Sequence, residues 1–276
     1  MPRIGMGTWP LLGSACADMV QGAVDRGYRL FDTAYKYGNE EAVGTGLRAS
    51  GVPRGEVFIT SKFNKEDHSI DGAQRAYDAS LAALGVDYLD LFLIHWPVPA
   101  RDRYVDAWRG LVKLLDQGRV KAIGVSNFDG PQIAALQALN LAPVSTNQFN
   151  WNPWAHGLHA ETAEYCFKNN VIVTAHTPVG DGLRVRGPSG TTHSGWPALE
   201  QLAAKYKRSQ TQIILRWELQ RGVSIVPGSG NPKHIKENLD IYSFQLTDEE
   251  MDVITAFKDD ERAKSMIFQP IGAQTE

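Results

Sequence analysis

Four apolar segments in the first half of the chain end in residues that can hold or move a proton. The segments RLFDTA, VFITSK, LDLFLIH and KAIGVSN carry, near their ends, Asp32, Lys62, His95 and the pair Ser126 and Asn127. A tyrosine, Tyr37, follows Asp32 by five residues. If one fold brings these ends together, a phenol beside an ammonium, a carboxylate and an imidazole makes a proton-donating site.

The residue types suggest a division of labour within such a site. An ordinary tyrosine, with a pKa of about 10, is a poor proton donor near neutrality. A nearby ammonium lowers that pKa by favouring the phenolate. We therefore expect Lys62 to activate Tyr37, and Asp32 to keep Lys62 charged and oriented. His95 would hydrogen-bond a substrate oxygen beside Tyr37, which is a better acid candidate than Tyr35 because it directly precedes a helix start at GNEE.

Each of these residues also has an ordinary structural explanation. A histidine that ends an apolar strand is often a hydrogen-bonded core residue, and an aspartate there often caps the next helix. A lysine can extend its ammonium to solvent, and a tyrosine is common at a rim. The argument for chemistry therefore depends on the four occurring together at the ends of consecutive strands.

The rest of the sequence alternates short apolar runs with amphipathic stretches. We predict strands over 4–8, 29–33, 57–61, 89–95, 121–125, 144–148, 171–175 and 223–226. Their Val, Ile, Phe and Leu content with little alternation is typical of strands buried on both faces. Helical spacing is found in ADMVQGAVDRG, EEAVGTGLRAS, AQRAYDASLAALG and VDAWRGLVKLLDQG. LTDEEMDVITAF opens with a capping box formed by Thr247 and Glu250.

Eight strand-helix units in about 250 residues predict a single-domain α/β fold, the (β/α)8 barrel, over residues 1–276. The C-terminal ends of its strands share one face, where barrel enzymes build their sites. A doubly wound open sheet is the alternative, but no GxGxxG follows the first strand. The Gly-rich segment 179–197 is a candidate lid, and the tail 258–276 could also reach the barrel mouth.

Bulk composition excludes several classes of function. The chain has 276 residues, a formal charge of -3 and a pI near 6.2, so nothing draws it generally to nucleic acid or an anionic membrane. Its two cysteines, Cys16 and Cys166, lack metal-ligand spacing, so we expect packing residues in a reducing compartment and no metal. Without a signal peptide or a run long enough to span a bilayer, we expect a cytoplasmic protein.

At this point the sequence resembles the aldo-keto reductase family. The motifs GMGTW, FDTAYKYGNEEAVG, FITSKF, LFLIHWP, VKAIGVSNF, NQFNWNP and ENLDIYSFQLT match that family in order and spacing, from residue 4 to about 257. The resemblance implies a barrel that reduces carbonyl groups with NADPH. The family's short hairpin ahead of the first strand has no counterpart here, so either the chain is truncated or the barrel base is closed differently.

The resemblance also implies roles for individual residues. The family's catalytic tetrad falls on Asp32, Tyr37, Lys62 and His95. Thr8, Trp9 and Asp32 fall near the nicotinamide and the substrate, and Ser126, Asn127 and Gln148 on positions that hold the carboxamide. Trp9 and Trp96, with Tyr37 and His95, would form an apolar substrate pocket. Ordinary packing by the two tryptophans is the alternative for the pocket. For Ser126 and Asn127 the alternative is helix capping, which is compatible with the carboxamide role.

Two cofactor motifs depart from the family pattern. The usual Tyr-Ser-Pro-Leu-Gly after the seventh strand is here His176, Thr177, Pro178, Val179 and Gly180, so an imidazole replaces the tyrosine that stacks on nicotinamide. The usual Pro-Lys-Ser after the eighth is Pro227, Gly228 and Ser229, followed by Gly230. His234 replaces the arginine six residues beyond that lysine, while Glu237 and Asn238 match positions near the adenine.

The lost lysine and arginine grip the 2'-phosphate in relatives, so we expect a weakened preference for NADPH, with NADH used appreciably. The expected reaction passes a hydride to a small-molecule carbonyl, with Tyr37 as the general acid. A nicotinamide-binding sensor without turnover and a phosphate-handling barrel isomerase, suggested by GSGNPK at 228–233, remain alternatives. The resemblance suggests a monomer, and the aldehyde, ketone or keto-sugar substrate stays open.

Overall fold

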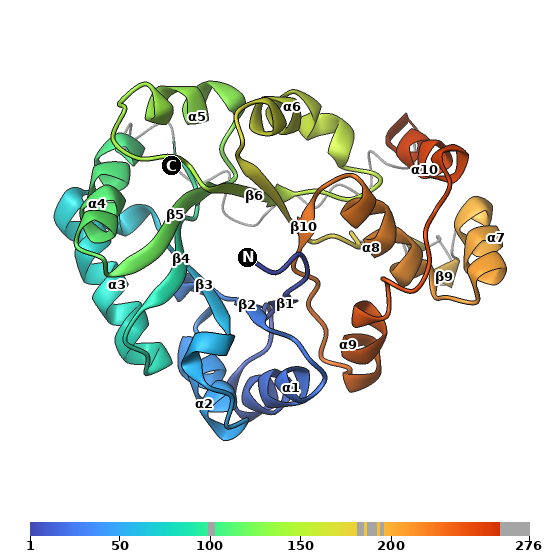
Figure 1. Ribbon diagram of the computed structural model, residues 1–276, viewed down its shortest axis with the longest axis horizontal. Coiled ribbons are helices and arrows are strands. Elements are labelled where there is room, and N and C mark those ends of the chain that lie inside the picture. The colour runs from blue at the N-terminus through green and yellow to red at the C-terminus, as the bar shows by residue number, and fades with distance from the viewer. Residues whose placement is uncertain (99–102, 181–184, 187–191, 194–195, 260–276) are drawn as a thin grey trace.

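Eight parallel strands follow one another around a ring in the order in which they occur in the chain (Figure 1). They are β1 (Met6–Gly7), β2 (Leu30–Asp32), β3 (Phe58–Phe63), β4 (Leu89–Ile94), β5 (Val120–Ser126), β6 (Thr146–Asn150), β7 (Ile172–His176) and β10 (Ser224–Ile225). Parallel bridges from Ile4 to Ile225 and from Gly7 to Gly228 join the last strand to the first. The ring is therefore closed, and the doubly wound open sheet is wrong.

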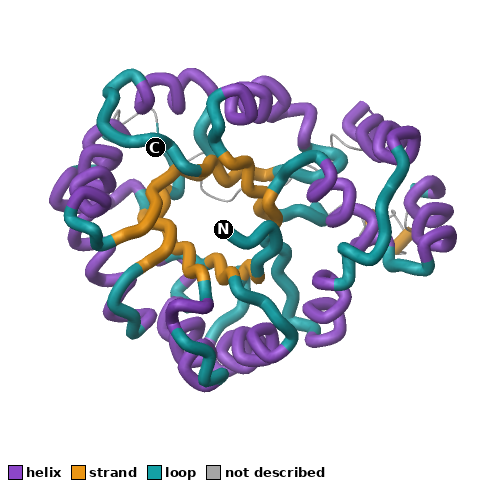
Figure 2. Tube along the Cα trace, in the orientation of Figure 1, coloured by secondary structure: helices purple, strands orange, loops and turns teal. Residues whose placement is uncertain are grey.

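The computed structural model describes residues 1–98, 103–180, 185–186, 192–193 and 196–259. Its α-helices are α1 (Gly13–Asp25), α2 (Glu40–Ala49), α3 (Ile70–Leu84), α4 (Tyr104–Asp116), α5 (Gly130–Gln137), α6 (Ala160–Lys168), α7 (Pro197–Tyr206), α8 (Gln210–Gln220), α9 (Pro232–Leu239) and α10 (Asp248–Thr255). They surround the strands, as Figure 2 shows. Two further strands, β8 (Val185–Arg186) and β9 (Thr192–His193), pair antiparallel outside the ring.

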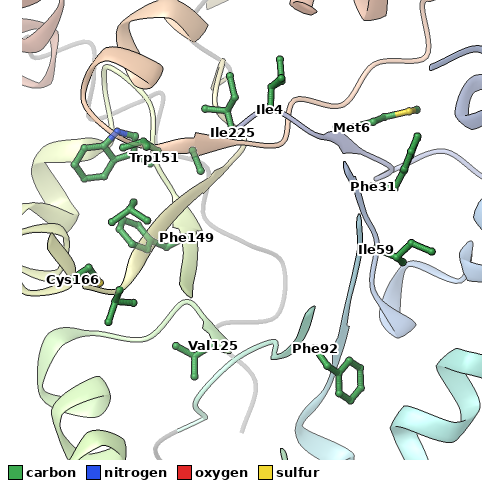
Figure 3. Packing of buried hydrophobic residues seen from close by; sticks show 14 of the residues in the cluster. Ile4, Met6, Phe31, Ile59, Phe92, Val125, Phe149, Trp151, Cys166 and Ile225 are labelled. Atoms are coloured by element: carbon green, nitrogen blue, oxygen red, sulfur yellow. The ribbon is translucent and has the colours of Figure 1, made fainter. Parts of the chain in front are cut away.

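The hydrophobic core lies between the ring of strands and the helices. Phe31, Ile59, Phe92 and Val125 are fully buried, and Figure 3 shows them pointing away from the inside of the ring. Because successive side chains of a strand point to opposite faces, their neighbours point into the barrel. This alternation is what turns Asp32 and Lys62 toward the inside.

Local sequence signals mark the ends of several helices, although α1 and α3 begin earlier than predicted, at Gly13 and Ile70. Thr247 and Glu250 form the predicted capping box at the start of α10. Helix α3 begins after Ser69, whose hydroxyl accepts from the backbone of Gly72, and ends at Gly85 in the left-handed region. These caps satisfy backbone groups that a helix leaves unpaired at its ends.

The eight predicted strands are all present, but four extend beyond the predicted bounds. β3 continues to Phe63, β5 ends at Ser126, β6 ends at Asn150 and β7 ends at His176. Lys62, Ser126 and His176 therefore lie inside strands rather than after them. Most of the candidate lid 179–197 and of the tail 258–276 lies outside the described residues. The N-terminal residues enter the middle of the ring in Figure 2, where Met1 and Pro2 line a small cavity together with Leu30 and Leu91.

Candidate active site

The predicted tetrad comes together at one end of the barrel. Asp32 is the last residue of β2, Lys62 lies in β3, and His95 directly follows β4. Tyr37 ends a 3-10 turn over Tyr35–Tyr37, between β2 and α2. The phenol and imidazole rings meet edge to face, with centroids 5.7 Å apart.

The ammonium of Lys62 has a partner for each of its three hydrogens. Its Nζ lies 2.6 Å from Oδ1 of Asp32, 2.9 Å from the carbonyl oxygen of Thr33 and 3.4 Å from the hydroxyl oxygen of Tyr37. An ammonium can only donate, so the hydroxyl of Tyr37 accepts from it. The hydrogen of that hydroxyl is therefore left to be donated elsewhere.

Asp32 is held through both of its carboxylate oxygens. Oδ1 accepts from Lys62, and Oδ2 accepts from Nε2 of Gln148 at 2.7 Å. Gln148 reaches Asp32 because it lies within β6 rather than at its end. The carboxylate is thus fixed from two strands and cannot turn away from the lysine.

The charges of this cluster differ in part from the prediction. Burial raises the pKa of Tyr37, and this effect outweighs the lowering by the charge of Lys62. The prediction of a lowered pKa for Tyr37 is therefore wrong, because desolvation penalises the phenolate more than one ammonium favours it. Burial also disfavours the ammonium, but Asp32 and Tyr37 together raise the pKa of Lys62.

His95 lies beside Tyr37 as a neutral imidazole. Burial holds its pKa well below the ordinary value, with smaller contributions from Lys62, His176 and Lys36. Its Nδ1 is buried without a hydrogen-bond partner in the described part of the chain. The half-buried Trp96 stacks on it with ring centroids 6.4 Å apart.

The loop after β1 places one aromatic ring over the tyrosine. Trp9 is 57% exposed, and its ring centroid is 5.4 Å from that of Tyr37. Thr8, in contrast, is fully buried and donates its hydroxyl to the carbonyl oxygen of Asp32. Thr8 therefore supports the wall of the site, while Trp9 faces its opening.

The amide and hydroxyl residues after β5 form a connected network. Nδ2 of Asn127 donates to the carbonyl oxygen of His95 and to Oγ of Ser126, at 3.0 Å each. Ser126 in turn donates to the carbonyl oxygen of Gln148. Helix α5 is capped instead by Asp129, so the capping alternative for Ser126 and Asn127 is wrong.

His176, at the end of β7, joins this network from the other side. Its Nε2 lies 3.1 Å from Oδ1 of Asn127, and its Nδ1 lies 3.1 Å from the hydroxyl of Thr177. Burial lowers the pKa of His176 to about 3, assisted by the charges of Lys62 and His159. The turn that follows, through Pro178, Val179 and Gly180, closes with a hydrogen bond from Gly180 to Thr177.

The loop after β10 lies close to the loop after β1. A Cβ at Gly228 would stand 2.8 Å from the carbonyl oxygen of Gly7 and 3.0 Å from that of Trp9, which explains why a glycine fits there. Oγ of Ser229 lies 3.3 Å from Nδ1 of His234 and accepts from the backbone of Asn231.

Other members of the predicted cofactor set line the same loop or lie beyond it in α9. Pro227 accepts through its carbonyl oxygen from Gly7, and Gly230 lies against Leu11. In α9, Asn238 is buried, while Glu237 is 3.7 Å from the ammonium of Lys233. The segment therefore approaches the barrel mouth through its contacts with β1 and the loop that follows it.

The sequence and the fold both match known proteins. Residues 3–259 match the Aldo/keto reductase family. An aldo-keto reductase of Mycobacterium marinum is 38% identical over 264 residues, which cover 96% of this chain and 90% of that protein. The chain belongs to the aldo/keto reductase family. It is an NAD(P)H-dependent reductase, which decides against the phosphate-handling isomerase and the sensor.

Two further relatives extend the comparison. The glyoxal reductase of Bacillus subtilis is 39% identical, over 95% of this reductase and 91% of that protein. A crystal structure of a Bombyx mori aldo-keto reductase in complex with NADP has a TM-score of 0.85 and 34% identity, over 94% of this chain and 90% of that one. A nicotinamide cofactor and a small-molecule carbonyl substrate follow from membership of the family.

One buried residue of the reductase was not among the predicted site residues. Asn39 is 1% exposed and accepts the hydroxyl hydrogen of Thr33 at 2.7 Å. Its Nδ2 donates to Thr8 and to the carbonyl oxygen of Leu11, so it ties the loop that carries Trp9 to the turn that carries Tyr37. The only sequence signal is its place two residues after Tyr37, in a motif that was interpreted as a helix start.

The described residues hold neither a membrane span nor a metal cluster. No helix among them is long and apolar enough to cross a membrane. They also contain no group of three or more His, Cys, Asp or Glu side chains arranged to hold a metal ion. Cys16 and Cys166 are both buried free thiols, as expected for packing residues.

Proposed function

We propose that the reductase converts an aldehyde or ketone to an alcohol, with Tyr37 as the proton donor. The observation that carries this proposal is the hydrogen bond from Lys62 to Tyr37. Because the phenol oxygen accepts from an ammonium, its own hydrogen is available to a carbonyl oxygen in the mouth. As the proton leaves, the same ammonium stabilises the phenolate.

The raised pKa of Tyr37 is compatible with this role. A general acid must hold its proton until the carbonyl oxygen gains charge, and Tyr37 is protonated at neutral pH. Neutral His95 offers a hydrogen-bond donor to the same oxygen without placing a second positive charge beside Lys62. Asp32, held by Gln148, keeps Lys62 in place and compensates its charge.

The residues at the mouth fit a nicotinamide cofactor by their chemistry. Ser126, Asn127 and Gln148 bring a hydroxyl and two amides to one side, the groups that hold a carboxamide. His176 adds an aromatic face on which a flat ring can stack, with less area than a tyrosine. When bound, a reduced nicotinamide dinucleotide supplies the hydride for the carbonyl carbon.

We propose further that NADH is used beside NADPH. Gly228 has no charge, and the crowding at its Cβ leaves no room for a lysine without a backbone shift. His234 carries an imidazole in place of the permanently charged guanidinium of an arginine. Lys233 and Lys236 lie nearby, but an ammonium lacks the bidentate fork of an arginine. Thr8, Glu237 and Asn238 would serve both cofactors alike.

For the substrate we propose a small carbonyl compound that enters between Trp9, Trp96, Tyr37 and His95. The exposed Trp9 and half-buried Trp96 give this opening apolar walls. A relative named glyoxal reductase supports a small aldehyde as the first substrate to test. We also propose a cytoplasmic monomer, since two free buried thiols suit a reducing compartment.

The test is the consumption of NADPH and NADH with glyoxal and with an aromatic aldehyde. The proposal predicts loss of reduced-cofactor absorbance with at least one aldehyde, and comparable kcat/KM for the two cofactors. A preference for NADPH of several hundred-fold would overturn the cofactor proposal. No turnover with aldehydes or ketones, alongside normal cofactor binding, would overturn the proposed reaction.

A further inference from the structure

His176 and Asn127 form a hydrogen bond whose direction can be worked out from their surroundings. The carbonyl oxygen of His95 can only accept, and the side-chain amide of Asn127 lies 3.0 Å from it. The amide nitrogen must therefore face that carbonyl, since an oxygen there would repel it. This leaves Oδ1 of Asn127 facing the ring of His176 at 3.1 Å.

The protonation of the imidazole follows from this orientation. Oδ1 of Asn127 can only accept, so Nε2 of His176 carries the hydrogen and donates it. In a neutral ring, Nδ1 is then an acceptor, and the hydroxyl of Thr177, 3.1 Å away, donates to it. The backbone carbonyl of His95, just after β4, thus determines the tautomer of a histidine on β7.

The backbone supports this arrangement at some cost. Thr177 has a φ of 53° and Asn127 a φ of 62°, both in the left-handed region. Asparagine visits that region readily, but a β-branched threonine there is strained. The carbonyl oxygen of Thr177 accepts from Asn152 and from Gly180, which hold the strained turn. This backbone conformation keeps the hydroxyl of Thr177 beside His176.

One lone pair on the side chain of Asn127 is left unused. Both hydrogens of Nδ2 are donated to His95 and Ser126, and one lone pair of Oδ1 accepts from His176. The second lone pair of Oδ1 remains, so Asn127 can offer a ligand only an acceptor. The group that suits it is an N–H donor, which a carboxamide carries.

We propose that His176 is a positioning residue that fixes the amide of Asn127 so that its oxygen can accept the N–H of the nicotinamide carboxamide. This inference rests on the proposed role of Asn127 in cofactor binding. It assigns His176 a function through its hydrogen-bond donor, in addition to any stacking by its ring. The two functions predict opposite effects for two substitutions.

The Kd of NADPH, measured by the quenching of tryptophan fluorescence, distinguishes the two functions. His176→Phe keeps an aromatic ring and loses the donor, so Kd should rise about 3- to 10-fold, as expected for one lost hydrogen bond. His176→Gln loses the ring but keeps a side-chain N–H about as far from the backbone as Nε2. Its Kd for NADPH should therefore stay within about twofold of that of the unmodified protein. The reverse order would show that the ring alone matters and would overturn the proposal.

A double-mutant cycle adds a control for general damage. Asn127→Gly removes the amide and tolerates the left-handed backbone, so His176→Phe should then have no further effect on Kd. An equal effect of His176→Phe with and without Asn127 would contradict a role through that residue. Thermal unfolding of each variant shows whether it is folded.

A second measurement needs no cofactor. The ¹⁵N shifts of the His176 ring, assigned by comparison with His176→Gln, should report a neutral ring with hydrogen on Nε2 from about pH 5.5 to 8. Hydrogen on Nδ1, or a titration within that range, would overturn the assignment. If the protein binds neither NADPH nor NADH while the tautomer is as expected, the proposed function and the cofactor role of His176 fail, and the hydrogen bond stands as a structural one.

Discussion

The ammonium of Lys62 lies 2.6 Å from Oδ1 of Asp32, and neither residue is more than 3% exposed. Within the barrel, the pair also forms hydrogen bonds with the carbonyl oxygen of Thr33, the hydroxyl of Tyr37 and the amide of Gln148. Burying two charges costs desolvation energy, so such a pair stabilises a fold little in total, although removing one partner is costly.

Lys62→Met should therefore destabilise the protein more than the double variant Asp32→Asn, Lys62→Met. The single variant leaves the carboxylate of Asp32 buried without its cation, at a cost of about 3–5 kcal/mol. The double variant removes both charges and should recover most of that loss, while remaining inactive. Urea unfolding at pH 7 measures both, and equal stability of the two variants would contradict an uncompensated charge.

Asn39→Ala should lower both stability and activity. It removes the acceptor of the Thr33 hydroxyl and the donor to the carbonyl oxygen of Leu11, while the carbonyl oxygen of Thr8 keeps the backbone N–H of Leu11 as a donor. Unsatisfied buried groups cost about 1–3 kcal/mol each, so we expect a loss of at least about 2 kcal/mol in unfolding free energy. Asn169→Ala, at an exposed amide, is the matched control. A drop in kcat larger than that in the control would show that Asn39 also positions Tyr37. No change in either the free energy of unfolding or kcat would refute this role of Asn39.

Glu218 should make the protein less stable as the pH rises. Its carboxyl group is fully buried, and both oxygens lack a hydrogen-bond partner in the described part of the chain. Burial raises the pKa of Glu218 well above its ordinary value of 4.5. Above pH 4.5 the unfolded chain has released this proton while the folded protein still holds it, so stability falls by up to about 1.4 kcal/mol per pH unit until the folded-state pKa is passed.

Glu218→Gln removes this titrating group from both the folded and the unfolded state. The free energy of unfolding should therefore depend less on pH in this variant. Urea unfolding at pH 5, 6, 7 and 8 should show the variant gaining stability relative to the unmodified protein until the folded-state pKa of Glu218 is passed. Glu161→Gln, at an exposed position of α6, should follow the unmodified protein. Parallel pH curves for the unmodified protein and Glu218→Gln would mean that Glu218 is not buried as a neutral acid.

His234→Arg should shift cofactor preference toward NADPH. The side chain is exposed beside Ser229, so an arginine fits without repacking. A charge-assisted contact to the 2'-phosphate contributes about 1.5–3 kcal/mol, so the ratio of kcat/KM for NADPH over NADH should rise about tenfold or more. His234→Gln, which adds no charge, should leave the ratio nearly unchanged at pH 8. A rise with glutamine equal to that with arginine would place the phosphate elsewhere.

The sequence predicted the barrel because the signals that specify it are local and repeated. Apolar runs such as 89–95, and helix ends such as Gly85, are visible in a window of a few residues. The placement of Asp32 and Lys62 on one face followed from the parallel order of the strands. The tetrad could thus be gathered from strand order and residue type alone.

Other features depend on distance and solvation, which a sequence does not show. The pKa of Tyr37 was predicted with the wrong sign because the depth of burial, which outweighs Lys62, arises only from packing. The bond between Gln148 and Asp32 joins residues 116 positions apart, on β6 and β2. The bond between His176 and Asn127 joins residues 49 positions apart, one at the end of β7 and one just after β5. Asn39 was missed because its partners lie in two segments, the loop after β1 and the turn after β2, whose contact the sequence does not show.

The central claim is that Tyr37 donates the proton, and Tyr37→Phe tests it most directly. The measurement is the single-turnover rate of NADPH oxidation with glyoxal, together with the Kd of NADPH for the same variant. We expect a rate lower by about a hundredfold or more, as for loss of a general acid, and a Kd within about twofold of the unmodified protein. A variant that keeps a substantial part of the rate would contradict the assignment of Tyr37.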